Sequence, residues 1–337
     1  MGALAPLRVS GADVRVGTCS WADKTLTNDS NWYPKRSMRA ADRLAFYASQ
    51  FPIVEVDSTY YFPPTPELAE SWVERSPDGF VFDVKAWSLL TGHPTFPHSL
   101  WEDLQNEVKP EFRDKRNMYA KHLPKEVVQE CWARFRHALA PLWEAGKLGG
   151  VLLQWPEWFG PKPKARDEIL AAVEWLHPYP CLIEFRRASW LEGEECDETL
   201  SFLEAHGLPY VGVDEPQGFK SSMPAVIAAT SRLAVVRFHG HNDANWTRKD
   251  ITAAERFNYF YEDAELGPWA WRLRELAATA DEVHVLFNNC WQDNAVRNAA
   301  TMQAMLAVES ETAPSAGPFG LAADGRGPET VAAPALF

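Results

Sequence analysis

The amino-acid sequence predicts an α/β fold, a (β/α)8 or TIM barrel, on two observations. Short apolar runs rich in β-branched residues recur along the chain, and segments with helical periodicity separate them. Nearly every run ends in a polar or charged cluster, as expected where the carboxyl ends of barrel strands surround a site. The eight predicted strands are Val14–Ser20, Ile53–Ser58, Phe80–Ala86, Gly150–Trp155, Cys181–Arg186, Tyr210–Asp214, Ala234–His239 and Val283–Asn289.

The segments between these strands have the pattern of amphipathic helices. In Arg39–Phe51 the apolar side chains recur at helical spacing and form one face. The segment Pro66–Ser76 has proline at its first helical position, directly after Thr65, a good N-cap residue. A further helix is predicted for Asp293–Val308.

Two connections are too long for simple strand-to-helix loops. They are Ser88–Lys125, after the third strand, and Gly240–Glu262, after the seventh. Because both leave the carboxyl ends of strands, we expect them to fold over the site as lids or binding walls. A purely stabilising cap over the barrel is the alternative interpretation.

The domain organisation is predicted to be simple. Residues 1–12 form an N-terminal extension, residues 13–309 one barrel domain, and residues 310–337 a disordered tail rich in Ala, Gly and Pro. No change of composition divides the central part of the chain, and barrels of this size routinely form one domain.

Composition and charge exclude several classes of function. The 337 residues are 46% hydrophobic and carry a formal net charge of −13, which disfavours non-specific nucleic-acid binding. No stretch approaches the roughly 20 apolar residues that span a bilayer, and Met1–Ser10 lacks the features of a signal peptide. The five cysteines show no CxxC spacing, so reduced thiols and a cytoplasmic location are expected.

The chemistry is expected at the carboxyl ends of the strands. Side chains at positions i and i+2 share a face of a strand, so Val54 and Val56 are expected to face the helices and Glu55 the barrel interior. The predicted catalytic residues are Glu55, Glu184, Lys85, Asp214 and His239. The predicted substrate-binding residues are Arg186, Arg237, Gln154, Asn288, Asn289, Trp21, Tyr60, Trp155, Trp190 and Trp246.

Tryptophan is concentrated near these strand ends. Of 15 tryptophans, several fall at or just beyond strand ends, among them Trp21, Trp155 and Trp190. Flat aromatic faces at one pole favour stacking on sugar rings or nucleobases. Filling of the core is the alternative interpretation for each of them.

Seven strand-end motifs together resemble the DUF72 (YecE-like) family. They are Gly17-Thr18-Cys19-Ser20-Trp21, Glu55-Val56-Asp57-Ser58-Thr59-Tyr60-Tyr61, Phe82-Asp83-Val84-Lys85, Leu153-Gln154-Trp155-Pro156, Glu184-Phe185-Arg186 with Ser189-Trp190, Arg237-Phe238-His239-Gly240 and Phe287-Asn288-Asn289. The resemblance spans residues 14–308 and implies a TIM barrel. It implies no reaction, because the family is named for its unknown function. Compared with the family pattern, this chain has Asp57 where Asn is common and a longer segment at His93–Lys125.

A metal-free mechanism is the preferred hypothesis. Arg186 and Arg237 are predicted to clamp a phosphate or carboxylate, and Glu184 or Glu55 to carry a proton. Lys85 is predicted to act as a cationic electrophile, a base or an imine former. These parts fit a hydrolase or lyase that acts on an anionic, ring-bearing substrate such as a phosphate ester, with no cofactor.

Three alternatives remain open at this stage. A Mg²⁺ or Mn²⁺ ion is the first, and its predicted ligands are Glu55, Asp57, Glu184, Asp214 and His239. The second is a glycoside hydrolase that uses Glu55 and Glu184 as its carboxyl pair on a sugar-like ligand. The third is a non-catalytic protein that binds a nucleotide or single-stranded nucleic acid. None of the three involves a membrane.

Overall fold

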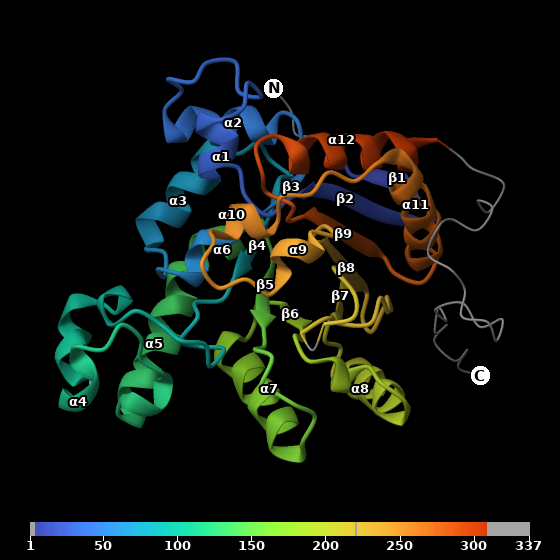
Figure 1. Cartoon of the computed structure of the whole chain (residues 1–337). Coiled ribbons are helices and arrows are strands. Elements are labelled where there is room, and N and C mark those ends of the chain that lie inside the picture. The colour runs from blue at the N-terminus through green and yellow to red at the C-terminus, as the bar shows by residue number, and fades with distance from the viewer. Residues whose placement is uncertain (1–3, 220, 309–337) are drawn as a thin grey trace.

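Eight parallel strands form a nearly closed barrel with helices around it (Figure 1). The structure is a computed structural model that describes residues 4–219 and 221–308. Neighbouring strands follow the order β6-β5-β4-β3-β2-β9-β8-β7. Their bounds are β2 Ala12–Thr18, β3 Ile53–Val56, β4 Val81–Lys85, β5 Leu148–Gln154, β6 Cys181–Glu184, β7 Val211–Asp214, β8 Leu233–Phe238 and β9 Glu282–Phe287. The predicted barrel is confirmed, and each predicted strand agrees with the structure to within two residues at either end.

The barrel closes at a weak seam between β6 and β7. The two strands share one isolated parallel bridge, between Ile183 and Tyr210. The backbone N–H of Ile183 donates to the carbonyl of Pro209 at 2.8 Å. Elsewhere each strand pairs with both of its neighbours in the sheet.

Helices cover the outside of the barrel. The main ones are α2 Ala40–Ala48, α3 Pro66–Arg75, α5 Lys125–Ala138, α7 Pro163–Leu176, α8 Glu194–Ala205, α11 Asp263–Ala277 and α12 Asn294–Ala307. The hydroxyl of Thr65 accepts from the N–H of Leu68 at 3.2 Å, so α3 begins at the predicted N-cap. The N-terminal extension contains a short strand β1, Leu7–Val9, which is antiparallel to β2. The predicted disordered tail lies outside the described residues.

The predicted alternation of strand and helix is wrong for the connection between β7 and β8. Its described residues, 215–219 and 221–232, contain no helix. Pro216 and Pro224 remove backbone donors that a helix needs. Ile227 packs directly on β7, where a side chain at Gly212 would lie 2.9 Å from Cγ2 of Ile227. The segment itself therefore covers this part of the barrel.

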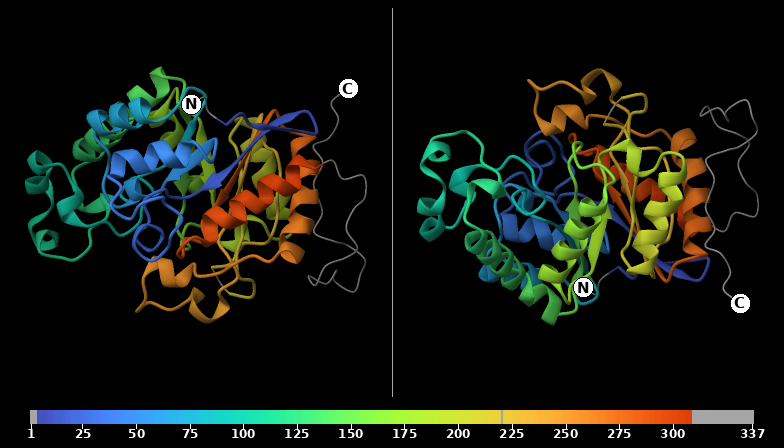
Figure 2. Two further views of the ribbon diagram at one scale, coloured as in Figure 1. Left: turned by 90° about the horizontal axis from the view of Figure 1, so that it is seen from above. Right: turned by 90° about the horizontal axis from the view of Figure 1, so that it is seen from below.

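The two long connections follow the strands that the sequence predicts, but they lie in different places relative to the mouth of the barrel. The connection after β8 contains α9, Asp243–Trp246, and α10, Ala253–Arg256, and both lie over the barrel end in Figure 1. The connection after β4 contains α4, Pro110–Arg113, which projects at the periphery of the molecule (Figure 2). Only the later connection therefore covers the mouth with helices.

Alternation along the strands divides the core into two layers. One apolar cluster lies inside the barrel and comprises Cys19, Ile53, Val81, Leu152, Leu182, Val211, Val235 and Leu286. The larger cluster contains the outward-facing Val54, Val56, Ile183 and Phe185 together with residues of the helices. Among the described residues, no helix is long and apolar enough to cross a bilayer.

Candidate functional site

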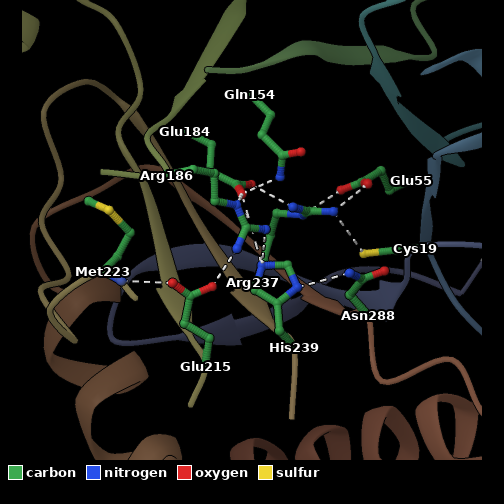
Figure 3. Close-up of polar contacts among 10 residues, drawn as sticks. All are labelled: Cys19, Glu55, Gln154, Glu184, Arg186, Glu215, Met223, Arg237, His239 and Asn288. Atoms are coloured by element: carbon green, nitrogen blue, oxygen red, sulfur yellow. Dashed lines mark hydrogen bonds and ion pairs between the residues drawn. The ribbon is translucent and has the colours of Figure 1, made fainter. Parts of the chain in front are cut away.

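The centre of the site is a buried arginine that holds two carboxylates (Figure 3). Arg237, at 1% exposure, donates from Nε and Nη2 to the two oxygens of Glu55 at 2.8 and 2.7 Å. Its Nη1 donates to Oε2 of Glu184 at 2.5 Å. The three side chains come from β8, β3 and β6, so the ion pairs connect strands from across the barrel. Such charges are stable in the interior only because they are paired.

A second arginine extends this network towards the mouth. Nε of Arg186 lies 2.7 Å from Oε1 of Glu184, and its Nη1 donates to Glu215. Its Nη2 donates to Nε2 of His239 at 2.9 Å. Since a guanidinium only donates, Nε2 of the neutral imidazole is the acceptor of this bond. Nδ1 of the same ring lies 2.8 Å from the amide nitrogen of Asn288. Gln154 completes the network by donating to Glu184 at 2.5 Å.

Electrostatics fix the protonation of this network. Burial alone would raise the pKa of Glu184, but Arg186 and Arg237 outweigh it and hold this pKa at about 2. Burial raises the pKa of Glu215 to about 7 against the opposing effect of Arg186. Burial and the charge of Arg186 lower the pKa of His239 well below its usual value. Glu184 is therefore ionised and His239 neutral at pH 7.

A cavity of about 180 Å³, the mouth cavity, opens beside the ion pairs. It is lined by Asp23, Asp57, Tyr60, Tyr61, Lys85, Gln154, Arg186, Arg237, Ala253, Ala254, Phe257, Asn288 and Cys290. Gln154, Arg186 and Phe257 also line an outer cavity of about 460 Å³ under α9 and α10. Asp23, Asp57 and Tyr61 also line a side cavity of about 530 Å³ near Trp21 and Glu55. The mouth cavity therefore shares walls with both of the others at the carboxyl ends of the strands.

Lys85 has an unusual environment in this cavity. Within the described residues its ammonium makes no hydrogen bond and has no carboxylate within 4.0 Å, and it lies 4.5 Å from the centre of the Tyr60 ring. The buried Lys147 is a useful contrast, since its Nζ donates to the carbonyls of Val73 and Ser76 at 2.9 and 2.7 Å. Burial and the charge of Arg237 lower the pKa of Lys85. Its unpaired amine is thus directed to whatever occupies the cavity.

Asp57 is the titratable carboxyl of the same cavity. No hydrogen bond to its carboxylate is found among residues 4–219 and 221–308, which separates it from Glu55 and Glu184. Burial and the neighbouring charge of Glu55 raise its pKa to about 7. A group with this pKa can both give and take a proton near neutral pH.

Three predicted site residues face the surrounding helices and not the barrel interior. They line none of the three cavities. Asp214 pairs in register with Phe238 and shares its outward face, where it accepts from Tyr261 at 2.6 Å and contacts His241 at 2.9 Å. Asn289 donates to Asn298 at 2.8 Å under the helices. Trp155 stacks on a neighbouring ring in the outer core. The prediction took strand-end position alone and did not apply alternation to these residues.

The tryptophans divide between core and mouth. Trp190 is fully buried, and its indole N–H donates to the carbonyl of Phe159 at 2.6 Å, so it fills the core. Trp246 lines the outer cavity and Trp21 the side cavity. Trp158 also lines the outer cavity and is 53% exposed.

The alternative metal site is not supported by the geometry. In the described ranges no group of three or more His, Cys, Asp or Glu side chains is arranged to hold a metal ion. Glu55 and Glu184 face arginine, and Asp214 lies on the other face of the sheet. A cation at these residues would compete with Arg237 for the same oxygens.

Several residues of the site were absent from the prediction. Glu215, which binds Arg186, follows the predicted end of its strand by one residue, and alternation from Val213 would have placed it in the interior. Tyr61 and Phe257 come from loops and Arg256 from the short helix α10, and no periodic signal in the sequence assigns such residues to a cavity.

A larger hollow lies at the opposite pole. It measures about 1030 Å³ and is lined by residues at the amino ends of strands, including Val81, Leu148 and Leu233. In TIM barrels the site is built from the loops at the carboxyl ends. The ion pairs and the unpaired Lys85 lie at that end here, so the mouth cavity is the candidate site although it is smaller.

Comparisons with known proteins give a consistent result. Residues 15–319 match the family model described as "Protein of unknown function DUF72". The UPF0759 protein YunF of Bacillus subtilis is 32% identical over 304 residues, which are 88% of this chain and 95% of that protein. A DUF72 family protein of Enterococcus faecalis has 27% identity and a TM-score of 0.70, covering 90% of this chain and 98% of that one. A DUF72 family protein of Thermotoga maritima has 28% identity and a TM-score of 0.66, with 87% and 98% covered. The chain belongs to the DUF72 family.

Proposed function

We propose that this protein is an enzyme that performs acid–base chemistry on a small, anionic, ring-bearing compound, such as a phosphate ester, in the mouth cavity. Hydrolysis or a lyase reaction fits the residues present. The observation that carries the proposal is the unpaired ammonium of Lys85 beside the ionisable carboxyl of Asp57. Perturbed titratable groups that face a cavity instead of each other are typical of active sites.

The charge of the cleft supports an anionic ligand. The outer cavity is lined by Arg186, Arg248, Lys249 and Arg256, with Glu157 as its acid. The whole chain has a net charge of −13, so this local excess of cations is not a consequence of composition. Cations concentrated in a cleft attract anionic ligands and orient them.

The role of the two central arginines differs from the predicted clamp. Arg237 and Arg186 donate their hydrogen bonds to groups of the protein itself. The acceptors are carboxylates, a sulfur and an imidazole. We therefore assign them to holding the strand ends in place, together with Glu55 and Glu184. Binding of the anion is assigned to Lys85 and to Arg248, Lys249 and Arg256 of the outer cavity.

Aromatic walls support a ring in the ligand. Tyr60, Tyr61 and Phe257 line the mouth cavity, and Trp158 and Trp246 line the outer cavity. Stacking of a ring on such faces contributes about 1–3 kcal/mol per base in single-stranded nucleic-acid complexes. In this proposal the ring lies between these walls, and Asp57 exchanges the proton.

The glycosidase alternative has less support. Such an enzyme needs one carboxyl that is protonated and accessible to the glycosidic oxygen. Glu184 is ionised, with Oε1 contacted by Gln154 and Arg186 and Oε2 by Arg237, and Glu55 is bound through both oxygens. Neither carboxyl therefore has an oxygen that is free of a protein donor and open to the glycosidic oxygen.

The proposal includes a reducing compartment such as the cytoplasm. The five cysteines support it, because all of them are free thiols in the structure. Secreted proteins more often use cysteines in disulfides.

A thermal-shift screen tests the proposal. Wild-type protein is compared with Lys85→Met and with Lys164→Met, a surface control whose side chain is 87% exposed. The ligands are ring-bearing phosphates, neutral oligosaccharides and short single-stranded DNA. Binding to the folded state raises Tm by mass action, so ring phosphates are expected to stabilise wild type and Lys164→Met but not Lys85→Met. A shift caused only by neutral oligosaccharides, or one that survives Lys85→Met unchanged, would contradict the proposal. A non-catalytic binder would bind equally well but convert no ligand, and turnover assays with Asp57→Asn separate these two cases.

A further inference from the structure

We propose that Lys85 is a nucleophile that forms an imine with an aldehyde or ketone group of the ligand. The inference deepens the proposed function and rests on it, because it uses the same cavity. It narrows the substrate class to an anionic, ring-bearing compound that contains a carbonyl group.

The position of Lys85 carries the inference. The residue ends β4, so a rigid strand presents its amine to the mouth cavity. An amine held by acceptors cannot attack a carbonyl carbon, and this is the situation of Lys147, whose Nζ contacts two carbonyls and the hydroxyl of Ser76. The amine of Lys85 has no such acceptor within the described ranges, and it lies 4.5 Å from the centre of the Tyr60 ring.

The groups around Lys85 favour its neutral form. Attack requires the free amine with its lone pair. Burial and the charges of Arg237 and Arg186 lower the pKa of Lys85, and they act against Glu55 and Glu184, which raise it. The two glutamates are themselves bound to the arginines, so their attraction for the ammonium is partly cancelled.

The reaction balances without an oxidant or reductant. The amine nitrogen of Lys85 attacks the carbonyl carbon, a C–N bond forms, and the π electrons of the carbonyl move to its oxygen, which takes the first proton of the amine. The carbinolamine then loses its hydroxyl as water after Asp57 donates a proton, and the nitrogen lone pair forms the C=N bond. The amine gives up its second proton to the ionised Asp57 when the neutral imine forms. In its protonated form the imine withdraws electrons from the adjacent carbon, which is the basis of lyase chemistry.

The cavity provides what such an intermediate needs. Asp57 lines the same cavity as Lys85 and has no competing partner in the described residues. Tyr60 and Phe257 offer ring faces on the cavity wall, and Arg186 connects it with the basic outer cavity. The cavity therefore offers a partner for each part of such a ligand: Lys85 for the carbonyl group, the aromatic wall for the ring and the basic outer cavity for the phosphate.

Pyridoxal 5′-phosphate is the probe that tests the inference, since it combines an aldehyde, a ring and a phosphate. Wild-type protein is incubated with it at pH 7, reduced with borohydride and mapped by mass spectrometry. Reduction converts an imine into a stable secondary amine, which marks the lysine that formed it. We expect Lys85 to be labelled first, about tenfold faster than exposed lysines, because a larger fraction of its amine is neutral at pH 7.

Variants and a matched ligand separate this inference from the proposed function. Labelling of the main site is expected to disappear in Lys85→Met and Lys85→Gln, persist in Lys164→Met and slow in Asp57→Asn. Pyridoxine 5′-phosphate, which lacks the carbonyl, reports binding alone. If it binds while label appears only on exposed lysines, the imine inference is wrong and the proposed function stands. If neither compound nor any other ring phosphate binds, the proposed function itself fails.

Discussion

Arg237 shows why a residue with buried charge can be retained in the barrel. Two carboxylates and one guanidinium are costly to remove from water, and apolar residues would fill the same volume at lower cost. Here the guanidinium connects β8 to β3 and β6 and leaves the amine of Lys85 without a carboxylate partner. The buried ion pairs thus prepare the charge state of the cavity while contributing little net stability.

We predict that Arg237→Met lowers the free energy of unfolding by about 3–5 kcal/mol, because Glu55 and Glu184 would remain buried without a partner. Urea denaturation measures the change. Adding Glu55→Gln to this variant is expected to recover part of the loss. Arg232→Met is the control, since Arg232 is 91% exposed in its ion pair with Asp281 and its removal should change stability little. A small effect of Arg237→Met would contradict the structural role.

The raised pKa of Asp57 predicts a stability that depends on pH. An aspartate that titrates near 3.9 when unfolded and at about 7 when folded favours the folded state below pH 3.9, and this contribution is lost as the pH rises through 7. Asp57→Asn cannot ionise, so we expect the variant to become more stable than wild type above pH 7, by about 2 kcal/mol. Denaturation at pH 5 and pH 8 checks this. Equal differences at both pH values would show that Asp57 titrates normally.

At the scale of elements, a second buried network joins β9 to β4 at the other end of the barrel interior. Nδ1 of His284 lies 2.8 Å from Asp83 and its Nε2 3.2 Å from Glu282, which in turn accepts from Arg15 at 2.6 Å. Burial alone would lower the pKa of His284, but the two carboxylates raise it to about 9. The imidazole is therefore charged at pH 7 and connects two strands that are not neighbours in the sheet.

We predict that His284 stabilises the fold up to mildly alkaline pH. A histidine with a raised folded pKa contributes fully below its unfolded value of about 6.5, and the contribution is lost as the pH rises through about 9. His284→Gln is expected to cost about 3 kcal/mol at pH 6, and the difference from wild type should largely close above pH 9. Chemical denaturation at these two pH values measures it. A difference that does not change with pH would indicate that only packing was lost.

The contact between β2 and β3 depends on a glycine. A Cβ atom at Gly17 would lie 2.1 Å from the backbone carbonyl oxygen of Ile53, so Gly17→Ala must separate the two strands. We expect a loss of about 3 kcal/mol in the free energy of unfolding, at the upper end of overpacking effects. Gly267→Ala, in α11, is the matched control: its Cβ meets nothing within 4 Å, and alanine is the better helix former. Similar Tm values for the two variants would contradict this packing.

The sequence predicted the eight strands because buried parallel strands give continuous apolar runs, a signal that is local. No comparable local signal indicated that the described part of the connection between β7 and β8 lacks a helix. Its apolar residues Met223 and Ile227 are buried although this part has no helical structure. Alternation also had to be applied residue by residue. Alternation places Glu215 inside the barrel and Asp214 outside it. Their position at the end of a strand alone does not distinguish the two residues.

For the molecule as a whole, the weakest part of the barrel is the seam between β6 and β7. A single bridge at Ile183 joins the two strands, whereas β8 and β9 pair over six residues from Leu233 to Phe238. Local opening occurs where few backbone hydrogen bonds protect a segment.

We predict that the Ile183 amide, which donates to Pro209, exchanges hydrogen earlier than the amides of β9. Native-state hydrogen exchange with fragment analysis measures this. A ligand bound in the mouth cavity should slow the exchange, because Glu184 and Arg186 connect the end of β6 to the site. Uniform protection of all eight strands would show that the seam is as stable as the rest.

The convergence of the site is a property of the closed barrel and could be predicted only in part. The sequence identified Lys85, Gln154, Arg186 and Arg237 as strand-end residues, and all of them line the mouth cavity. It did not indicate that Arg237 is consumed by Glu55 and Glu184, because pairing across the barrel depends on the register of strands that are distant in the chain. That pairing decides which amine remains free.

The most direct test of the proposed site is the dissociation constant of pyridoxine 5′-phosphate, measured by calorimetry for wild type, Lys85→Met and Lys164→Met. If Lys85 is the unpaired cation of a ligand site, wild type and Lys164→Met bind with equal affinity and Lys85→Met binds at least about tenfold more weakly, a difference of about 1.4 kcal/mol. Equal affinity of all three proteins would contradict the account, as would a failure of wild type to bind either this compound or any other ring phosphate.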